Sequence, residues 1–160
     1  MTAAFPMEGG CTCRAVRFAL SAPPLFVHCC HCTWCRRESG AAFALNAMIE
    51  TEQVSLLCGT PEPVATPSAS GKGQTILRCP ACRVALWSHY AGAGEKIAFV
   101  RVGTLDRAEL VPPDIHIFTA SRLPWVVLPE GATAVAEYYR ARDHWPAESL
   151  ARRARLLGAA

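Results

Sequence analysis

Nine cysteines, eight of which fall in three short clusters, constrain this chain more than any other feature. An odd number of cysteines cannot pair completely, and their share of the 160 residues is below the roughly 8–10% of a disulfide scaffold. The clusters are Cys11 with Cys13, then Cys29, Cys30, Cys32 and Cys35, and then Cys79 with Cys82, while Cys58 stands alone. In a reducing compartment, clustered cysteines are more often metal ligands or reactive thiols than disulfides. We therefore expect zinc.

Length and composition predict a single domain with one hydrophobic core. The chain has 51% hydrophobic and 18% charged residues, enough apolar side chains to fold and too few residues for a separate cofactor domain. Residues 1–8 lack the basic and apolar regions of a secretory signal, and no apolar run reaches the roughly 18 residues of a membrane span. We expect a cytoplasmic protein with no membrane partner.

The charge distribution argues against a nucleic-acid partner. The formal net charge is +3, and residues 140–160 carry five arginines against Asp143 and Glu148. The remaining residues are therefore balanced, with eleven basic and eleven acidic side chains. A nucleic-acid-binding domain usually has a stronger basic patch on its body.

Short apolar or alternating runs predict an all-β domain of about eight strands. The runs are Cys13–Leu20, Leu25–His28, Ala42–Ile49, Val54–Leu57, Thr75–Leu77, Val84–Ser88, Ile97–Val102 and Ile115–Thr119. The stretch Thr60–Gln74 is rich in proline, serine and glycine, so we expect a connection rather than an element there.

The C-terminal part of the chain predicts two short helices. Val135, Tyr138, Tyr139 and Arg142 have helical spacing, and Pro146 can begin a second helix with Leu150, Ala154 and Leu157 on one face. We predict a zinc-containing domain over residues 1–135 and a basic, helical extension over residues 136–160. The extension either caps the sheet or docks a partner.

Two cysteine pairs predict a closed, structural zinc site. A tetrahedral zinc with four thiolates at about 2.3 Å needs ligands in tightly spaced pairs. Cys11 and Cys13 can point to one side of an extended segment, and Pro80 restricts the turn between Cys79 and Cys82. The four cysteines complete one site, and its binding free energy would stabilise the fold. A redox dithiol and buried inert cysteines are the alternatives.

The middle cluster offers three further thiolates, Cys30, Cys32 and Cys35. Three protein ligands with an open fourth position are typical of catalytic zinc, whereas four ligands close a structural site. The fourth ligand would come from Cys29, Cys58, His28 or His31 if this site were structural. The spacing leaves both alternatives open, and either one gives two zinc ions per chain.

An ordered set of motifs resembles the glutathione-dependent formaldehyde-activating family, which includes a centromere protein V branch. The residues that carry the resemblance are Gly9-Gly10-Cys11-Thr12-Cys13, Cys30-His31-Cys32-Thr33-Trp34-Cys35-Arg36-Arg37-Glu38-Ser39-Gly40 with Phe43, Arg78-Cys79-Pro80-Ala81-Cys82, Gly103-Thr104-Leu105-Asp106, His116-Ile117 and Pro124-Trp125. The resemblance implies a zinc-containing β-tent fold, a structural zinc on Cys11, Cys13, Cys79 and Cys82, and a catalytic zinc on Cys30, Cys32 and Cys35. The chain departs from the family pattern at Arg14 and Arg83, where glycine is common.

The resemblance also implies the reaction. Members of the family join glutathione and formaldehyde to S-hydroxymethylglutathione and are classed as carbon–sulfur lyases. Zinc with three thiolates is electron-rich and suits a thiol, which it can hold as the nucleophilic thiolate. The expected partners are therefore a small glutathione-like thiol and a small aldehyde. The alternative function is a non-catalytic, zinc-stabilised protein-interaction module.

Residues beside the three-cysteine cluster are candidates for binding the substrate. Arg36 and Arg37 are expected to hold substrate carboxylates, unless they form a solvated surface pair. Trp34 is expected to line the pocket or to serve only in packing. His31 is expected to be structural or to support a ligand, and His116 and Trp125 line either the site or the sheet. Cys29 and Cys58 have no assigned role.

Overall fold

The computed structural model describes residues 4–158. Its strands are β1 (Met7–Gly10), β2 (Arg17–Leu20), β3 (Phe26–Cys30), β4 (Ala44–Glu50), β5 (Val54–Cys58), β6 (Glu62–Thr66), β7 (Gln74–Arg78), β8 (Ala85–Tyr90), β9 (Ile97–Arg101) and β10 (Ile115–Ile117). The α-helices are α1 (Thr33–Ser39), α2 (Ala141–His144) and α3 (Ala147–Leu157). Short 3-10 helices cover Thr51–Gln53, Gly94–Lys96, Val102–Thr104, Ala108–Leu110 and Thr119–Ser121. The predicted all-β fold with short C-terminal helices is confirmed.

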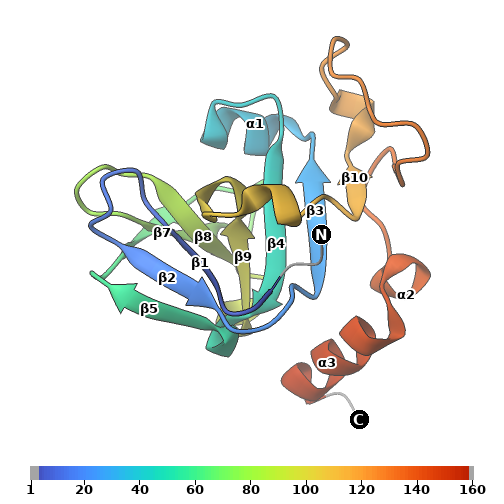
Figure 1. Cartoon of the computed structure of the whole chain (residues 1–160). Helices are drawn as coiled ribbons and strands as arrows, with labels where there is room; N and C mark the ends of the chain where they lie inside the picture. The colour runs from blue at the N-terminus through green and yellow to red at the C-terminus, as the bar shows by residue number, and fades with distance from the viewer. Residues whose placement is uncertain (1–3, 159–160) are drawn as a thin grey trace.

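The strands form two sheets. The larger sheet has seven strands in the order β10-β3-β4-β9-β8-β7-β6, and the smaller has three in the order β1-β2-β5. The only parallel pair among these strands of the described residues is β10 with β3. In Figure 1, α1 lies at the upper end of β3 and β4, and α2 and α3 follow β10 on the side of the molecule away from β5.

Strands β4 and β9 are buried on both faces, and each face belongs to a different core cluster. Ala47 and Ile49 face a cluster that includes the smaller sheet, whereas Met48 faces a second cluster. Ala98 and Phe99 divide in the same way. Because successive side chains of a strand point to opposite faces, a strand covered on both sides has an uninterrupted apolar sequence. The second cluster lies beside Cys30, Cys32 and Cys35.

Three sequence predictions about the strands were wrong in part. Residues 60–74 contain strand β6, which pairs with β7 at the edge of the larger sheet. Pro63 is compatible with this position because an edge strand does not use all of its backbone donors. Strand β1 was missed, and the strand predicted from Cys13 begins only at Arg17 because residues 13–16 form a turn.

The helix predicted over Val135–Arg142 was also wrong. Residues 135–140 run without helical structure, and α2 begins only at Ala141. The amide of Val135 donates to the carbonyl of His116, and the amide of Phe118 donates to the carbonyl of Glu137. Because these backbone groups form hydrogen bonds with another segment of the chain, they cannot form the hydrogen bonds of a helix. The second predicted helix, α3, follows Pro146 as expected.

The C-terminal segment packs against the larger sheet. Trp145 stacks on Phe26 at a centroid distance of 5.5 Å, and its indole donates to the hydroxyl of Tyr139 at 2.7 Å. On α3, Arg152 donates to both carboxylate oxygens of Glu50, at 2.9 and 2.6 Å. Within residues 4–158 no helix has the length and apolar character needed to cross a membrane.

Candidate metal centres and the adjoining cavity

Cys11, Cys13, Cys79 and Cys82 come together as the sequence predicts. Their sulfur atoms all lie within 4.8 Å of one another. The Cys11 and Cys13 sulfurs are 3.5 Å apart, and the Cys13 and Cys79 sulfurs are 3.6 Å apart. Four thiolates at the usual zinc–sulfur distance of about 2.3 Å would be separated by roughly 3.8 Å. The donor set therefore fits a tetrahedral zinc.

Two similar turns place these cysteines. The amide of Cys11 donates to the carbonyl of Val16, and the amide of Cys79 donates to that of Val84. Both turns contain an arginine in the left-handed region, Arg14 at φ 63° and Arg83 at φ 62°. This region favours glycine, so each of these two turns holds an arginine in a conformation that side chains rarely adopt. The extended conformation predicted for Cys11–Cys13 was wrong, because the pair lies in a turn.

The second cluster joins the end of β3 to the start of α1. Cys30 is the last residue of β3, Cys32 caps α1, and Cys35 lies in its first turn. The amide of Cys35 donates to the Cys32 sulfur at 3.3 Å, so the sulfur serves as the helix cap. All three sulfurs lie within 4.8 Å of one another, which fits a metal site with three thiolates.

Hydrogen bonding and burial shift the pKa values of the thiols in this cluster in different directions. Hydrogen bonds with Cys30 and then Cys35 lower the pKa of Cys32 to about 2 in the metal-free protein. The contact with Cys32, the contact with Cys35 and burial raise the pKa of Cys30. Three sulfurs this close cannot all be thiolates without a cation to balance their charge.

No fourth ligand completes the second cluster within residues 4–158. His28 contacts the hydroxyl of Tyr139, and Cys58 is exposed on β5. Cys29 and His31 instead form a third group with His116. The four residues considered from sequence as a fourth ligand are therefore placed elsewhere.

The third group is buried beside the second cluster. Nε2 of His31 lies 3.1 Å from Nδ1 of His116 and 3.6 Å from the sulfur of Cys29. These are ordinary hydrogen-bond distances, and the two rings stack at a centroid distance of 5.4 Å. The contacts orient His31, which stands between Cys30 and Cys32 in the chain.

Cys30, Cys32 and Cys35 open onto a cavity of about 610 Å³. Its wall includes polar side chains, among them Asn46, Ser68, Ser70 and Gln74, and the aromatic side chains Trp34, Tyr90, Phe99, Phe118, Tyr138, Tyr139 and Trp145. Among the described residues that line it, Lys72 and Arg153 are the only ones that are lysine, arginine, aspartate or glutamate. This volume is typical of a small-molecule site, and the cysteine cluster forms part of its polar surface.

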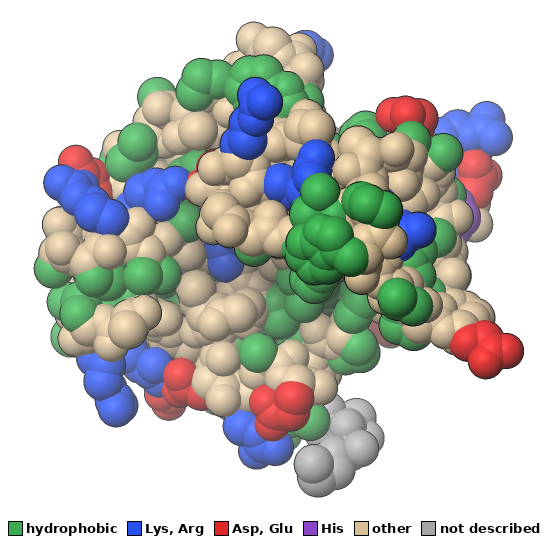
Figure 2. All heavy atoms as spheres, turned by 90° about the horizontal axis from the view of Figure 1, so that it is seen from above, with side chains coloured by type: hydrophobic (Ala, Val, Ile, Leu, Met, Phe, Trp, Pro, Cys, Tyr) green, Lys and Arg blue, Asp and Glu red, His purple; other side chains and the backbone are tan. Residues whose placement is uncertain are grey.

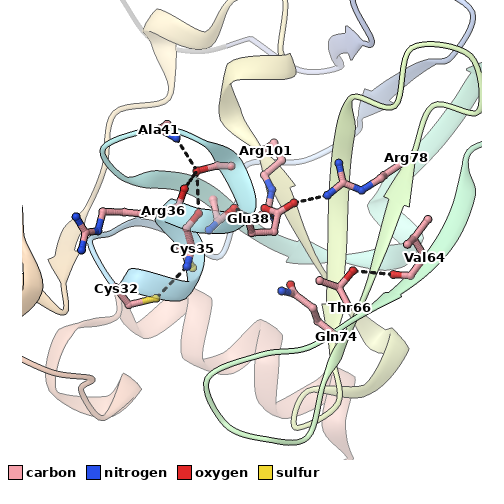
Figure 3. A network of polar contacts seen from close by, with 12 residues as sticks. Cys32, Cys35, Arg36, Glu38, Ala41, Val64, Thr66, Gln74, Arg78 and Arg101 are labelled. Atoms are coloured by element: carbon pink, nitrogen blue, oxygen red, sulfur yellow. Dashed lines mark hydrogen bonds and ion pairs between the residues drawn. The ribbon is translucent and has the colours of Figure 1, made fainter.

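An ion-pair network holds α1 on the sheet next to the cavity (Figure 3). Glu38 lies between Arg78 and Arg101 and pairs with both guanidinium groups. Arg101 also donates to the side-chain oxygen of Asn46, which lines the cavity. The network therefore ties the helix that carries Cys35 to strands β7, β9 and β4.

The predicted substrate-binding residues are divided between the cavity and the surface. Trp34 lines the cavity and is 50% exposed. Arg37 is exposed, Arg36 is half-buried, and neither belongs to the cavity wall. Trp125 is 68% exposed and also lies outside that wall.

Sequence reasoning missed the aromatic wall and the Glu38 network. Tyr138 and Tyr139 were considered only as positions of a predicted helix and Trp145 was not considered, although three large aromatics within eight residues were a visible signal. Glu38 was recognised only within a motif. Its partner Arg101 could not be found by spacing, because strands remote in sequence bring the two together.

Comparison with known families identifies the chain. A family model described as glutathione-dependent formaldehyde-activating enzyme matches residues 6–121. The chain belongs to this family. For this family member, a search of curated protein sequences gives no match.

Solved structures support the fold of this glutathione-dependent formaldehyde-activating family member. A crystal structure of a Rhodobacter sphaeroides protein is similar, with a TM-score of 0.50 and 18% sequence identity. The similarity covers 67% of this chain and 97% of that protein. At this identity the likeness concerns the fold alone.

Proposed function

We propose that the protein is a zinc-dependent carbon–sulfur lyase that acts on a thiol–aldehyde adduct. The reference reaction is formation of S-hydroxymethylglutathione from glutathione and formaldehyde. The observation that carries the proposal is the opening of Cys30, Cys32 and Cys35 onto a cavity, with no fourth ligand in the described part of the chain. The family match adds support because the family is named for formaldehyde activation.

We propose two zinc ions per chain with different roles. The first would be held by Cys11, Cys13, Cys79 and Cys82 and would join the turn after β1 to the turn after β7. The second would be held by Cys30, Cys32 and Cys35. Zinc bound there would supply a lowered thiol pKa, so that a substrate thiol is available as a thiolate at neutral pH.

The protein's own residues would position the substrate and exclude water from the reacting atoms. In the forward direction, the substrate sulfur attacks the carbonyl carbon, a carbon–sulfur bond forms as the C=O π bond opens, and the carbonyl oxygen takes up a proton that replaces the one lost by the thiol. In the reverse direction, the adduct hydroxyl loses its proton, the carbon–sulfur bond breaks, and the thiolate departs. The aromatic wall limits water around these atoms, and the Asn46 and Gln74 side chains supply polar groups. The buried side-chain oxygen of Gln74 has no hydrogen-bond partner within residues 4–158, so it is available to a substrate donor.

Arg36 and Arg37 remain proposed contacts for substrate carboxylates, although neither lines the cavity. Arg36 has a buried Nε for which the described residues offer no hydrogen-bond partner, and a bound anion could satisfy it. The alternative, a non-catalytic interaction module, is not favoured because it does not explain a cysteine cluster that faces a cavity. On the face in Figure 2, Lys and Arg side chains are scattered among other types rather than gathered in one patch. We further propose a cytoplasmic location, where the cysteines remain reduced.

Exchange spectroscopy by NMR tests this function. Glutathione, formaldehyde and their adduct interconvert without catalyst, so the observable is the increase in exchange rate caused by the zinc-loaded protein. We expect an increase proportional to protein concentration, and no increase with Cys30→Ser. Cys58→Ser is the matched control, because Cys58 is exposed on β5 and outside the metal clusters. An unchanged exchange rate with wild-type protein would refute the proposal.

A further inference from the structure

Two cationic side chains lie on the wall of the cavity beside the second cysteine cluster. Lys72 and Arg153 line the cavity, and no aspartate or glutamate among the described residues does so. Both residues are exposed, and neither forms an ion pair within residues 4–158. Cations without an acidic partner at the edge of a cavity attract anions. The wall therefore favours a ligand that carries carboxylates.

The two cations come from segments that lie far apart in the sequence. Lys72 lies in the loop between β6 and β7, whereas Arg153 lies on α3. The family match ends at residue 121, so α3 lies outside it. The guanidinium of Arg153 is 5.9 Å from the ring centroid of Trp145, which also lines the cavity. This cation–π contact holds the positive charge beside the cavity wall.

Contacts of its neighbours on α3 hold Arg153 in place. Arg152 donates to both carboxylate oxygens of Glu50 at the end of β4, at 2.9 and 2.6 Å. Nζ of Lys96, just before β9, donates to the carbonyl of Leu156 at 3.1 Å. These contacts fix α3 against the larger sheet before a ligand binds, so less entropy is lost when Arg153 takes up a carboxylate.

The loop that carries Lys72 also supplies hydrogen-bond acceptors. Ser70 lines the cavity, and its hydroxyl accepts from the amide of Lys72 at 3.3 Å. The buried side-chain oxygen of Gln74, also on the wall, has no hydrogen-bond partner among the described residues. An ammonium group has three N–H donors and needs such acceptors, whereas the indole of Trp145 beside Arg153 can only donate. The two sides of the cavity therefore suit different ends of a ligand.

We propose that Lys72 and Arg153 are the main contacts for the two carboxylates of a glutathione-like substrate. The inference rests on the proposed function and names the residues that select the thiol. Glutathione has a γ-glutamyl end with a carboxylate and an ammonium group, and a glycyl end with a carboxylate alone. The γ-glutamyl end lies against Lys72 and the acceptors beside it, and the glycyl carboxylate lies against Arg153. The C-terminal segment is thus part of the substrate site, and Arg36 and Arg37, outside the wall, have a smaller role.

Binding of an unreactive analogue tests the assignment without any need for turnover. The probe is S-methylglutathione, and calorimetry on the zinc-loaded full chain gives its Kd. Arg153→Gln and Lys72→Gln should each raise the Kd about three- to ten-fold, because each removes one charge-assisted contact at a partly solvated site. Arg155→Gln, at an exposed residue of the same helix outside the cavity wall, should leave the Kd unchanged. A larger effect of Arg37→Gln than of Arg153→Gln would overturn the assignment.

Esterification of the probe tests which end each cation holds. S-Methylglutathione with its glycyl carboxylate as an ethyl ester should bind wild type and Lys72→Gln about three- to ten-fold more weakly than the free acid does. In Arg153→Gln the ester and the acid should bind equally, because the partner of that carboxylate has been removed. An equal penalty for the ester in Arg153→Gln and in wild type would contradict the inference, as would a failure of S-methylglutathione to bind wild type.

The same variants separate this inference from the lyase function. If they weaken binding as expected but no thiol shows accelerated exchange, the carboxylate contacts stand and the proposed lyase function fails. If glutathione exchange is accelerated but neither Lys72→Gln nor Arg153→Gln changes the Kd, the lyase function stands and the assignment of the contacts fails.

Discussion

Glu38 on α1 and Arg101 on β9 form an ion pair in which each side chain is only 12% exposed. Glu38→Ala removes the carboxylate, so the largely buried guanidinium groups of Arg101 and Arg78 would lose their acidic partner. We expect a loss of about 1–3 kcal/mol in the free energy of unfolding and weaker metal binding at Cys35. Urea unfolding and zinc competition with a chelator measure the two effects. Glu62→Gln breaks an exposed ion pair with Arg83 and should cost no more than about 1 kcal/mol, so an equal loss in both variants would contradict this account.

Arg14 should tolerate glycine better than a β-branched residue, because its φ is 63°. Arg14→Gly keeps the turn and should change the free energy of unfolding by no more than about 1 kcal/mol in either direction. Arg14→Val forces a branched side chain into the left-handed region and should destabilise the protein by about 1–2 kcal/mol. Thermal unfolding of the zinc-loaded variants measures the difference, and equal stability would show that the turn is not held in this conformation.

The zinc content of cysteine variants should show which cluster binds each ion. We expect two zinc ions in wild type and one in Cys30→Ser, which should remain folded. Cys82→Ser should lose the other ion and much of its stability, because zinc binding by the four cysteines contributes directly to folding. Elemental analysis together with circular dichroism checks both variants. Cys29→Ser should keep two ions; a wild-type count of three that falls to two in this variant would instead assign metal to Cys29, His31 and His116.

Arg152 should control the order of the C-terminal segment. Arg152→Ala removes the partner of Glu50, a carboxylate whose side chain is 8% exposed. We expect faster amide hydrogen exchange over residues 141–158 with little change in the central strands, because α3 is held by this pair and a few apolar contacts. Arg155→Ala, on the exposed side of the same helix, is the matched control. Equal exchange in both variants would contradict the role assigned to the ion pair.

Local pattern predicted the strands and the metal-binding pairs, whereas contacts between distant segments were beyond it. Ala42–Ile49 and Ile97–Val102 were recognised because strands buried on both faces have continuous apolar sequences. β6 was missed because Pro61, Pro63 and Pro67 favour a loop, and only its pairing with β7 stabilises a strand there. The helix predicted over Val135–Arg142 was wrong for the same reason, because residues 135–137 form their backbone hydrogen bonds with residues 116–120.

The cysteine spacing predicted the two clusters but not their surroundings. Cys11 and Cys13 could be paired with Cys79 and Cys82 because zinc requires four ligands in tight pairs. The cavity is different, because its wall comes from α1, six strands of the larger sheet (β3, β4, β7, β8, β9 and β10), the loop after β6 and the C-terminal segment, which only the folded chain brings together. Arg36 and Arg37 were proposed from proximity in sequence, but the turn of α1 directs the chain so that Trp34 and Cys35 line the cavity instead.

Cobalt substitution tests most directly whether the second cluster has an open position for a thiol. Cobalt(II) replaces zinc at thiolate sites, and its visible absorption changes when a ligand is added or exchanged. With cobalt in both sites, adding an excess of a small thiol should change the bands of wild-type protein. The same addition should leave Cys30→Ser unchanged, because its remaining metal has four protein ligands. A wild-type spectrum that does not respond to any thiol would show that the second site is closed and would contradict the proposed lyase function.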